Sequence, residues 1–448
     1  MNKIANELGT EKISKLLIKQ AVPASIGILV MSLNMIVDTI FVGQWIGIMA
    51  IAAITVVLPI AFFISSVGMG IGIGGSSIIS RALGAKKYDN AFKTFGNQVS
   101  LTVGLSLLFV LIGTYFCFPI LQLFGANGEI VVPATEYFHI VIYGVPFLAF
   151  AMMGNPVIRA VGQPKFAMYT LIIPAIVNIV LDVLFIKVFD MGMYGAGLAT
   201  TLSYVSSGLF VFGFFLSSKS SLRIYIKNFI LDVKIVKEII SIGGVTIIRQ
   251  GTISLLIIIL NYTLFKYGGE IAIAIYGIIN RVMMFALFPV LGVTQGFLPI
   301  AGFNYGAKDS KRVQETIKTA ILYGTGVALL IFMGIVLFPD DVVRVFTENC
   351  ELLSKTPNAL LIAFLATPVI TAQLIGSAYF QAAGKAWPAL WLTLLKQGVF
   401  LIPLVYILPQ FYGVTGVWMS FPIADVLATS ITVLYLRREL NKNMISNT

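Results

Sequence analysis

The longest apolar stretch of the chain is the strongest constraint on its fold. Between residues 21 and 80, Asp38 is the only charged residue. A helix needs about 20 apolar residues to cross roughly 30 Å of hydrocarbon, so this stretch is long enough for two crossings. A carboxylate at membrane depth costs roughly 2.5–3.5 kcal/mol, which makes Asp38 a candidate functional residue.

The composition extends this interpretation to the whole chain. Of 448 residues, 58% are hydrophobic and 11% are charged, and the mean hydropathy is +0.95. A soluble domain has too small a core to hide so much apolar surface. We therefore predict a polytopic membrane protein. No small-residue cleavage site follows the first apolar span, so we expect a mature N-terminus and not a signal peptide.

Breaks at glycine, proline and charged clusters divide the chain into twelve predicted spans. The side with both termini, counted together with its connections and the adjoining ends of the spans, has 23 of the 30 Lys and Arg residues. By the positive-inside rule both termini are then cytoplasmic, with the chain in the plasma (inner) membrane. The basic excess reflects topology and lipid headgroups, and we expect no nucleic-acid partner. The predicted spans are 17–43, 49–80, 90–118, 132–159, 165–188, 193–217, 236–267, 271–301, 312–338, 353–382, 387–408 and 413–436.

The chain also repeats itself at one spacing. Three pairs of segments match, and their offset in residue number is constant to within one position: 81–87 with 303–309, 159–162 with 381–384, and 192–195 with 413–416. The matches predict an all-α protein of two six-helix bundles related by a pseudo-twofold axis, an architecture typical of alternating access. The predicted domains are an N-lobe at 1–217, a cytoplasmic linker at 218–235 and a C-lobe at 236–448.

Polar residues of the first half gather near one membrane depth. Asn34 precedes Asp38 by one helical turn, and Asn178 precedes Asp182 at the same spacing, so each helix presents an amide and a carboxylate on one face. At about 1.5 Å per residue, counting along the spans places both carboxylates level with Tyr137 and Thr200. Such oxygens suit a proton or Na⁺; the alternative is two separately hydrogen-bonded structural acids. The candidate site residues are Asn34, Asp38, Tyr137, Asn178, Asp182 and Thr200.

At these residues the chain resembles the multidrug and toxic compound extrusion (MATE) family along its whole length. The resemblance implies efflux coupled to a proton or Na⁺, with the DinF-like branch's N-lobe site on Asp38, Tyr137, Asn178, Asp182 and Thr200. The NorM-like branch also uses acids in spans 7 and 10, where the only acid here is Glu238 at the start of span 7. The matching features are Pro23 with Asp38 and Gly43, the segments 81–85 and 159–162, Asn178 with Asp182, the segment 195–197 before Thr200, and the segment 304–307.

Other residues suggest movement and charge in particular places. Pro23 removes a backbone hydrogen bond from span 1, which predicts a hinge there. In the second half, Lys396 and Asp425 lie near mid-depth, where they form either a structural ion pair or a substrate site. Arg249 and Arg281 have no acid within their spans, so they reach backbone carbonyls or a water-filled cavity.

The leading functional expectation is a secondary active exporter of amphipathic, cationic organic compounds, driven by proton or Na⁺ antiport. The alternative is a flippase-type exporter of lipid-linked or anionic substrates. The helix ends carry no HExxH or paired Asp motif, so we expect no enzyme. Without a Walker motif or a metal-ligand spacing of the cysteines, we expect no cofactor, and we expect a monomer in the bilayer. The glycine-rich run at 68–75 indicates close helix packing and not a nucleotide loop.

Overall fold

The computed structural model describes residues 7–222 and 225–445, in which helices dominate and no strand occurs. Eleven of these helices are long and apolar enough to cross a membrane. The longest, α9, contains one non-helical residue, Gly269, with φ 65° and ψ −159°. This break divides α9 into two spans, so the predicted set of twelve spans and the all-α fold class are confirmed.

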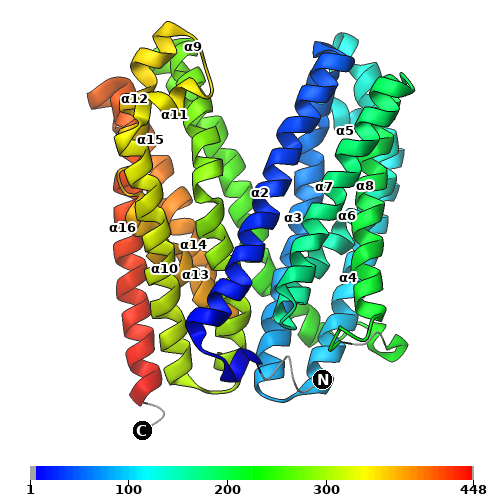
Figure 1. Cartoon of the computed structure of the whole chain (residues 1–448), viewed down its shortest axis with the longest axis vertical. Helices are drawn as coiled ribbons and strands as arrows, with labels where there is room; N and C mark the ends of the chain where they lie inside the picture. Colours follow the sequence, from blue (N-terminus) through cyan, green and yellow to red (C-terminus); the bar gives the residue numbers. More distant parts are fainter. Residues whose placement is uncertain (1–6, 223–224, 446–448) are drawn as a thin grey trace. The chain divides into compact units, whose positions relative to one another are not determined.

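The elements follow one another in the order shown in Figure 1. They are α2 (Ile13–Trp45), α3 (Ile48–Gly84), α4 (Tyr88–Tyr115), α5 (Cys117–Leu123), η1 (Gly128–Ile130), α6 (Val131–Ala160), α7 (Pro164–Asp182), η2 (Val183–Val188), α8 (Gly192–Leu216), η3 (Ile226–Phe229), α9 (Val233–Gly306), α10 (Ser310–Leu337), α11 (Pro339–Arg344), α12 (Cys350–Phe364), η4 (Thr367–Val369), α13 (Ile370–Ala382), α14 (Ala386–Leu394), η5 (Leu395–Leu401), α15 (Ile402–Ile407) and α16 (Pro409–Ile445).

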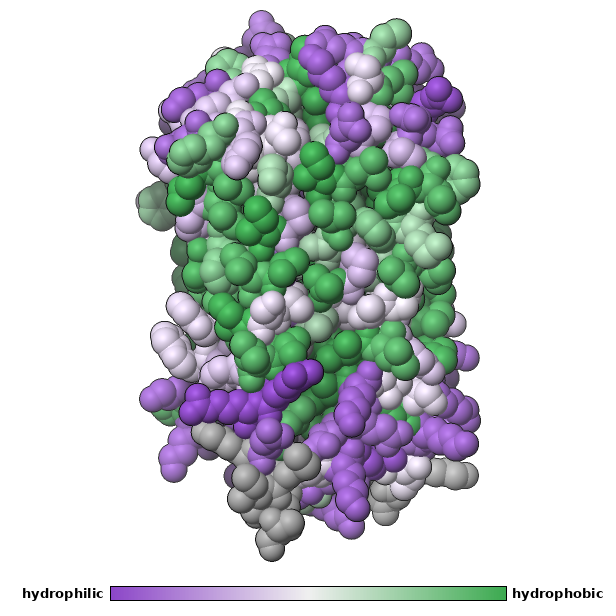
Figure 2. Space-filling model, turned by 90° about the vertical axis from the view of Figure 1, so that its left-hand side faces the viewer, coloured by the Kyte–Doolittle hydropathy of each residue, from purple (hydrophilic) through white to green (hydrophobic). Residues whose placement is uncertain are grey.

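The surface has the polarity of a membrane protein. On the face shown in Figure 2, apolar residues form a broad middle band and hydrophilic residues gather at both ends. A band of this kind matches the hydrocarbon layer, with the polar ends at the headgroups. Together with the apolar helices, it identifies a multi-pass membrane protein.

The sequence repeat reappears in the backbone of the turns. Residues with positive φ recur at equivalent positions of the two halves, including the non-glycine pair Lys86 (φ 58°) and Lys308 (φ 59°). Non-glycine residues adopt such a conformation rarely, so its recurrence indicates the same turn in both repeats. The other pairs are Gly47 with Gly269, Gly162 with Gly384, and Gly192 with Gly413.

One predicted span contains a break in its helix. Span 10, predicted at 353–382, corresponds to the apolar stretch Cys350–Ala382, but its α-helix ends at Phe364 and resumes at Ile370. Pro368 lies in the interruption, and proline both lacks a backbone donor and clashes with the preceding helical turn. Two further spans contain π-helical segments, η2 and η5, which hydropathy does not reveal.

The chain forms two compact units whose boundaries cross the repeat. Unit 1 comprises Ile26–Ile247 and the residues before Glu11, and unit 2 comprises Glu11–Ser25 and the chain from Ile248 onward. The beginning of α2 therefore belongs to unit 2, and the beginning of α9 belongs to unit 1. The two points of change, after Ser25 and after Ile247, are equivalent positions of the repeat.

Glycines allow the helices of unit 1 to approach closely. A Cβ atom at Gly72 of α3 would lie 2.7 Å from the carbonyl oxygen of Met153 in α6, and one at Gly68 would lie 2.8 Å from that of Ala149. Small residues permit such backbone contact between helices in a bilayer. The close packing expected of residues 68–75 is therefore present.

Replacing Gly72 by alanine should destabilise the protein by about 1–3 kcal/mol, because the new methyl group would have to displace backbone atoms of α6. Gly104→Ala is the matched control, since a Cβ there meets nothing within 4 Å; it should be neutral or stabilising by about 0.5–1 kcal/mol. The thermal unfolding midpoints of the purified variants in detergent measure the difference. Equal midpoints for the two variants would contradict the close contact.

Candidate functional site

The six polar residues selected from the sequence all lie within unit 1. Asn34 and Asp38 are on α2, Asn178 and Asp182 are on α7, and α6 and α8 supply the other two. Asp182 is the last α-helical residue before the π-helical segment η2. Such local changes of helix type are frequent at functional sites.

The two carboxyl groups of the site face each other. Asp38 and Asp182 are within side-chain hydrogen-bonding reach of one another. Asp182 is 0% exposed, and no described hydrogen-bond donor reaches either of its carboxyl oxygens. Ionised carboxylates are acceptors only, so the two groups can bond to each other only if one of them carries a proton. A cation between them would serve the same purpose.

The two asparagines join the same helices one turn away. Asn34 Nδ2 donates to Asn178 Oδ1 over 3.0 Å. This bond connects α2 to α7 directly beside the carboxyl pair, because each asparagine precedes its aspartate by one helical turn. Asn34 Oδ1 is buried and has no hydrogen-bond partner among the described residues. It is therefore another acceptor oxygen available to a bound ion.

Hydroxyl groups from α6 and α8 complete the site. The hydroxyl groups of Tyr137 and Thr200 are 3.2 Å apart and hydrogen-bonded, and both side chains are buried. Tyr137 is close enough to Asp38 and Asp182 to interact with their charges. Tyr204, which was not predicted from the sequence, lies within electrostatic range of both Asp38 and Tyr137. It follows Thr200 by one helical turn, so the spacing rule that linked Asn34 to Asp38 was sufficient to find it.

The oxygen atoms of the site are suitable ligands for a small hard cation or a proton. Its free acceptors are oxygens, the ligand type preferred by Na⁺ and similar hard ions. No group of three or more His, Cys, Asp or Glu side chains suited to a transition metal occurs in residues 7–222 and 225–445. The structure thus brings together all six residues selected from the sequence and adds Tyr204.

The charges of the second half are arranged differently. Lys396 Nζ lies 2.6 Å from Asp425 Oδ1, so these two residues form an ion pair, with Lys396 on the π-helical segment η5. Arg249 is partly buried and Arg281 is exposed. Neither arginine has a hydrogen bond or ion pair within the described part of the chain.

Comparison with known proteins supports a transporter. A solved MATE structure in the straight conformation superposes with a TM-score of 0.93 at 25% identity over 99% of both chains. A MATE structure in the bent conformation also gives 0.93 at 25% identity, covering 100% of this chain and 99% of that one. The multidrug export protein MepA of Staphylococcus aureus (strain MSSA476) is 26% identical over 422 residues, which cover 94% of this chain and 93% of MepA.

The sequence model of the MatE family matches the chain twice, once in each repeat, over residues 23–184 and 246–407. Together the two matches cover well over half of the chain. They agree with the fold and with the multidrug exporters among its relatives, and they point to transport and not to catalysis. The chain therefore belongs to the MATE family.

Proposed function

We propose that this protein is a secondary active multidrug exporter that exchanges a proton or Na⁺ for an amphipathic, cationic organic compound by alternating access. The observation that carries the proposal is the facing pair Asp38–Asp182, in which Asp38 is partly buried and both carboxyl oxygens of the fully buried Asp182 lack a described donor to compensate their charge. A buried uncompensated charge is costly, so this site favours taking up a positive ion. MepA, which is similar over nearly the whole chain, is a multidrug export protein.

The cost of burying uncompensated carboxylate charge explains how ion binding would be coupled to export. Uptake of a proton or Na⁺ reduces the net charge of the pair and allows Asp38 and Asp182 to be joined. Loss of the ion leaves two facing carboxylates that repel each other. Because Asp38 is on α2 and Asp182 is on α7, the change in charge acts on the contact between these two helices. An ion bound from outside thereby changes the shape of unit 1 while the substrate leaves.

The remaining features of the proposal concern environment and substrate. The protein works as a monomer in the plasma membrane with both termini in the cytoplasm, and it needs the bilayer and the coupling ion but no cofactor. Its substrates are small amphipathic compounds, because Met and Phe side chains adapt to varied apolar shapes. A carboxylate site in unit 1 favours cationic compounds among them.

The second candidate is export of lipid-linked or anionic substrates. It is favoured by Arg249 and Arg281, which lie in membrane-spanning α9 without a described partner. Arginine recognises phosphate and carboxylate groups through paired donors. Movement of a fluorescent anionic lipid in vesicles, lost in Arg249→Gln and Arg281→Gln while dye export persists, would favour this candidate over the first.

Asp38→Asn should reduce gradient-driven export of ethidium to the level of protein-free vesicles, because an amide cannot exchange a proton or hold Na⁺ by charge. The measurement is dye transport in proteoliposomes under imposed proton and Na⁺ gradients. Asp340→Asn, which changes an exposed acid of α11, should transport at the wild-type rate. Wild-type transport insensitive to both gradients, or full activity of Asp38→Asn, would contradict antiport through this site.

Pro23→Ala should weaken transport several-fold while leaving folding intact. Proline withholds one backbone hydrogen bond from α2 and so lowers the cost of bending it; alanine restores that bond. Transport is compared with the thermal unfolding midpoint of the same preparation. Unchanged export by a well-folded Pro23→Ala protein would contradict a hinge at this position.

A further inference from the structure

Two helix ends in this protein belong to the unit opposite to their own repeat. We name Ile13–Ser25 the α2 strap and Val233–Ile247 the α9 strap; the first belongs to unit 2 and the second to unit 1. Each strap continues without a break into a span of the other unit. Any movement between the units must therefore bend these helices or detach the straps.

Both straps rest on pairs of glycines at equivalent places. In unit 1, a Cβ at Gly70 would lie 3.0 Å from the carbonyl oxygen of Gly243, and one at Gly74 would clash with the carbonyl oxygen of Ile239. These contacts place the α9 strap directly against the backbone of α3. The side chain of Ile247 also approaches Gly70, with its Cγ1 atom 3.1 Å from the position of that Cβ. Glycines permit this close approach of two helices in a bilayer.

The α2 strap packs against a similar pair of glycines in unit 2, Gly292 and Gly296. A Cβ at Gly292 would lie 2.8 Å from the backbone nitrogen of Ser25, and one at Gly296 would lie 2.8 Å from that of Ala21. Gly292 and Gly296 follow Gly70 and Gly74 at the spacing of the repeat. A pair of glycines in close contact with the strap is thus common to both halves.

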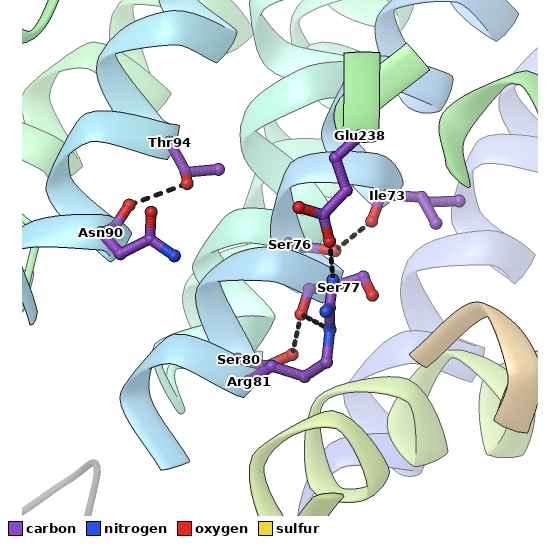
Figure 3. A network of polar contacts seen from close by, with 8 residues as sticks. All are labelled: Ile73, Ser76, Ser77, Ser80, Arg81, Asn90, Thr94 and Glu238. Carbon is purple, nitrogen blue, oxygen red and sulfur yellow. Dashed lines mark hydrogen bonds and ion pairs between the residues drawn. The ribbon is translucent and has the colours of Figure 1, made fainter. Parts of the chain in front are cut away.

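The charges around the two pairs of glycines are not equivalent. Arg81 Nη2 lies 2.8 Å from Glu238 Oε1, which ties the end of α3 to the α9 strap (Figure 3). Arg81 Nε also donates to the carbonyl oxygen of Ser77 over 3.1 Å, which orients the guanidinium toward the strap. The equivalent positions beside the α2 strap are Phe303 and Leu16, both apolar and buried.

The chain just before the α2 strap is held through its backbone. Arg312 Nη2 donates to the carbonyl oxygen of Glu11 over 2.8 Å, and Arg312 Nε donates to Asn304 Oδ1 over 3.0 Å. A bond to a main-chain carbonyl does not depend on an acidic side chain of the strap. The Arg81–Glu238 ion pair thus joins the α9 strap to α3. At the equivalent positions beside the α2 strap, Phe303 and Leu16 carry hydrocarbon side chains.

We propose that the α9 strap docks on and detaches from α3 during the transport cycle, and that the Arg81–Glu238 ion pair is the latch that sets its docked population. The pair suits this role because it is partly exposed, with side-chain exposures of 21% and 42%. An ion pair with such access to water changes an equilibrium by up to about five-fold. It holds the strap without locking it.

The test measures detachment directly on purified protein in lipid nanodiscs. Ser77 is 5% exposed and lies at helical spacing on the face of α3 that carries Gly70, Gly74 and Arg81. Ser77→Cys, in a Cys117→Ala, Cys350→Ser background, reports strap detachment as the rate of maleimide labelling. Glu238→Gln should increase this rate about two- to five-fold. The exchanged pair Arg81→Glu with Glu238→Arg should return it toward the original value.

Glu351→Gln is the matched control, because it removes the exposed Lys355–Glu351 pair of unit 2, which is also 2.8 Å long. It should leave the labelling of the Ser77→Cys thiol unchanged. Unchanged labelling in Glu238→Gln and Arg81→Glu, or an equal rise in Glu351→Gln, would overturn the latch. The assay uses neither drug nor gradient, so its result is independent of whether Asp38 couples export.

Discussion

The contact between Asp38 and Asp182 is the interaction on which the rest of the site depends. Asp182 is fully buried and no described donor reaches its carboxyl oxygens, so in the proposed function its contact with the partly buried Asp38 needs a shared proton or a bound cation. The bond between Asn34 and Asn178 fixes α2 and α7 at the same level. The proposed function therefore places an ion-dependent contact between α2 and α7 beside this hydrogen bond, so that a change in charge would act on the packing of the two helices.

Much of this could be predicted from the sequence, because lipid imposes regularity on the chain. Helical rise is fixed, and all spans begin and end at the same two surfaces, so counting residues gives depth. Depth alone does not give direction around a helix axis. Counting therefore found Asp38, Asp182, Tyr137 and Thr200, but it did not establish that the carboxyl groups face each other. Tyr204 was missed because a tyrosine in a membrane span is ordinarily attributed to packing or to the interface.

The exchange of the two straps was beyond sequence reasoning for a different physical reason. A run of glycines such as 68–75 indicates that some helix packs closely, but it does not identify the partner, since every small residue offers the same smooth surface. The partners are determined by the path of the whole chain through two units. Local breaks in helices are equally hard to predict from the sequence. Pro368 lies where the tenth span is interrupted, whereas Pro357 is accommodated within α12. The hydropathy of proline does not distinguish the two positions.

The repeat shows how one architecture carries different chemistry in its two halves. Four turns have a residue of positive φ at equivalent positions of the two repeats. The positions of the second repeat that are equivalent to the site are nevertheless occupied by apolar side chains packed in the core of unit 2. They are Leu256, Leu260, Ala359, Phe400 and Leu404, which correspond to Asn34, Asp38, Tyr137, Asn178 and Asp182. These five side chains offer no ligand to a proton or Na⁺. In the proposed function the coupling ion therefore acts on unit 1.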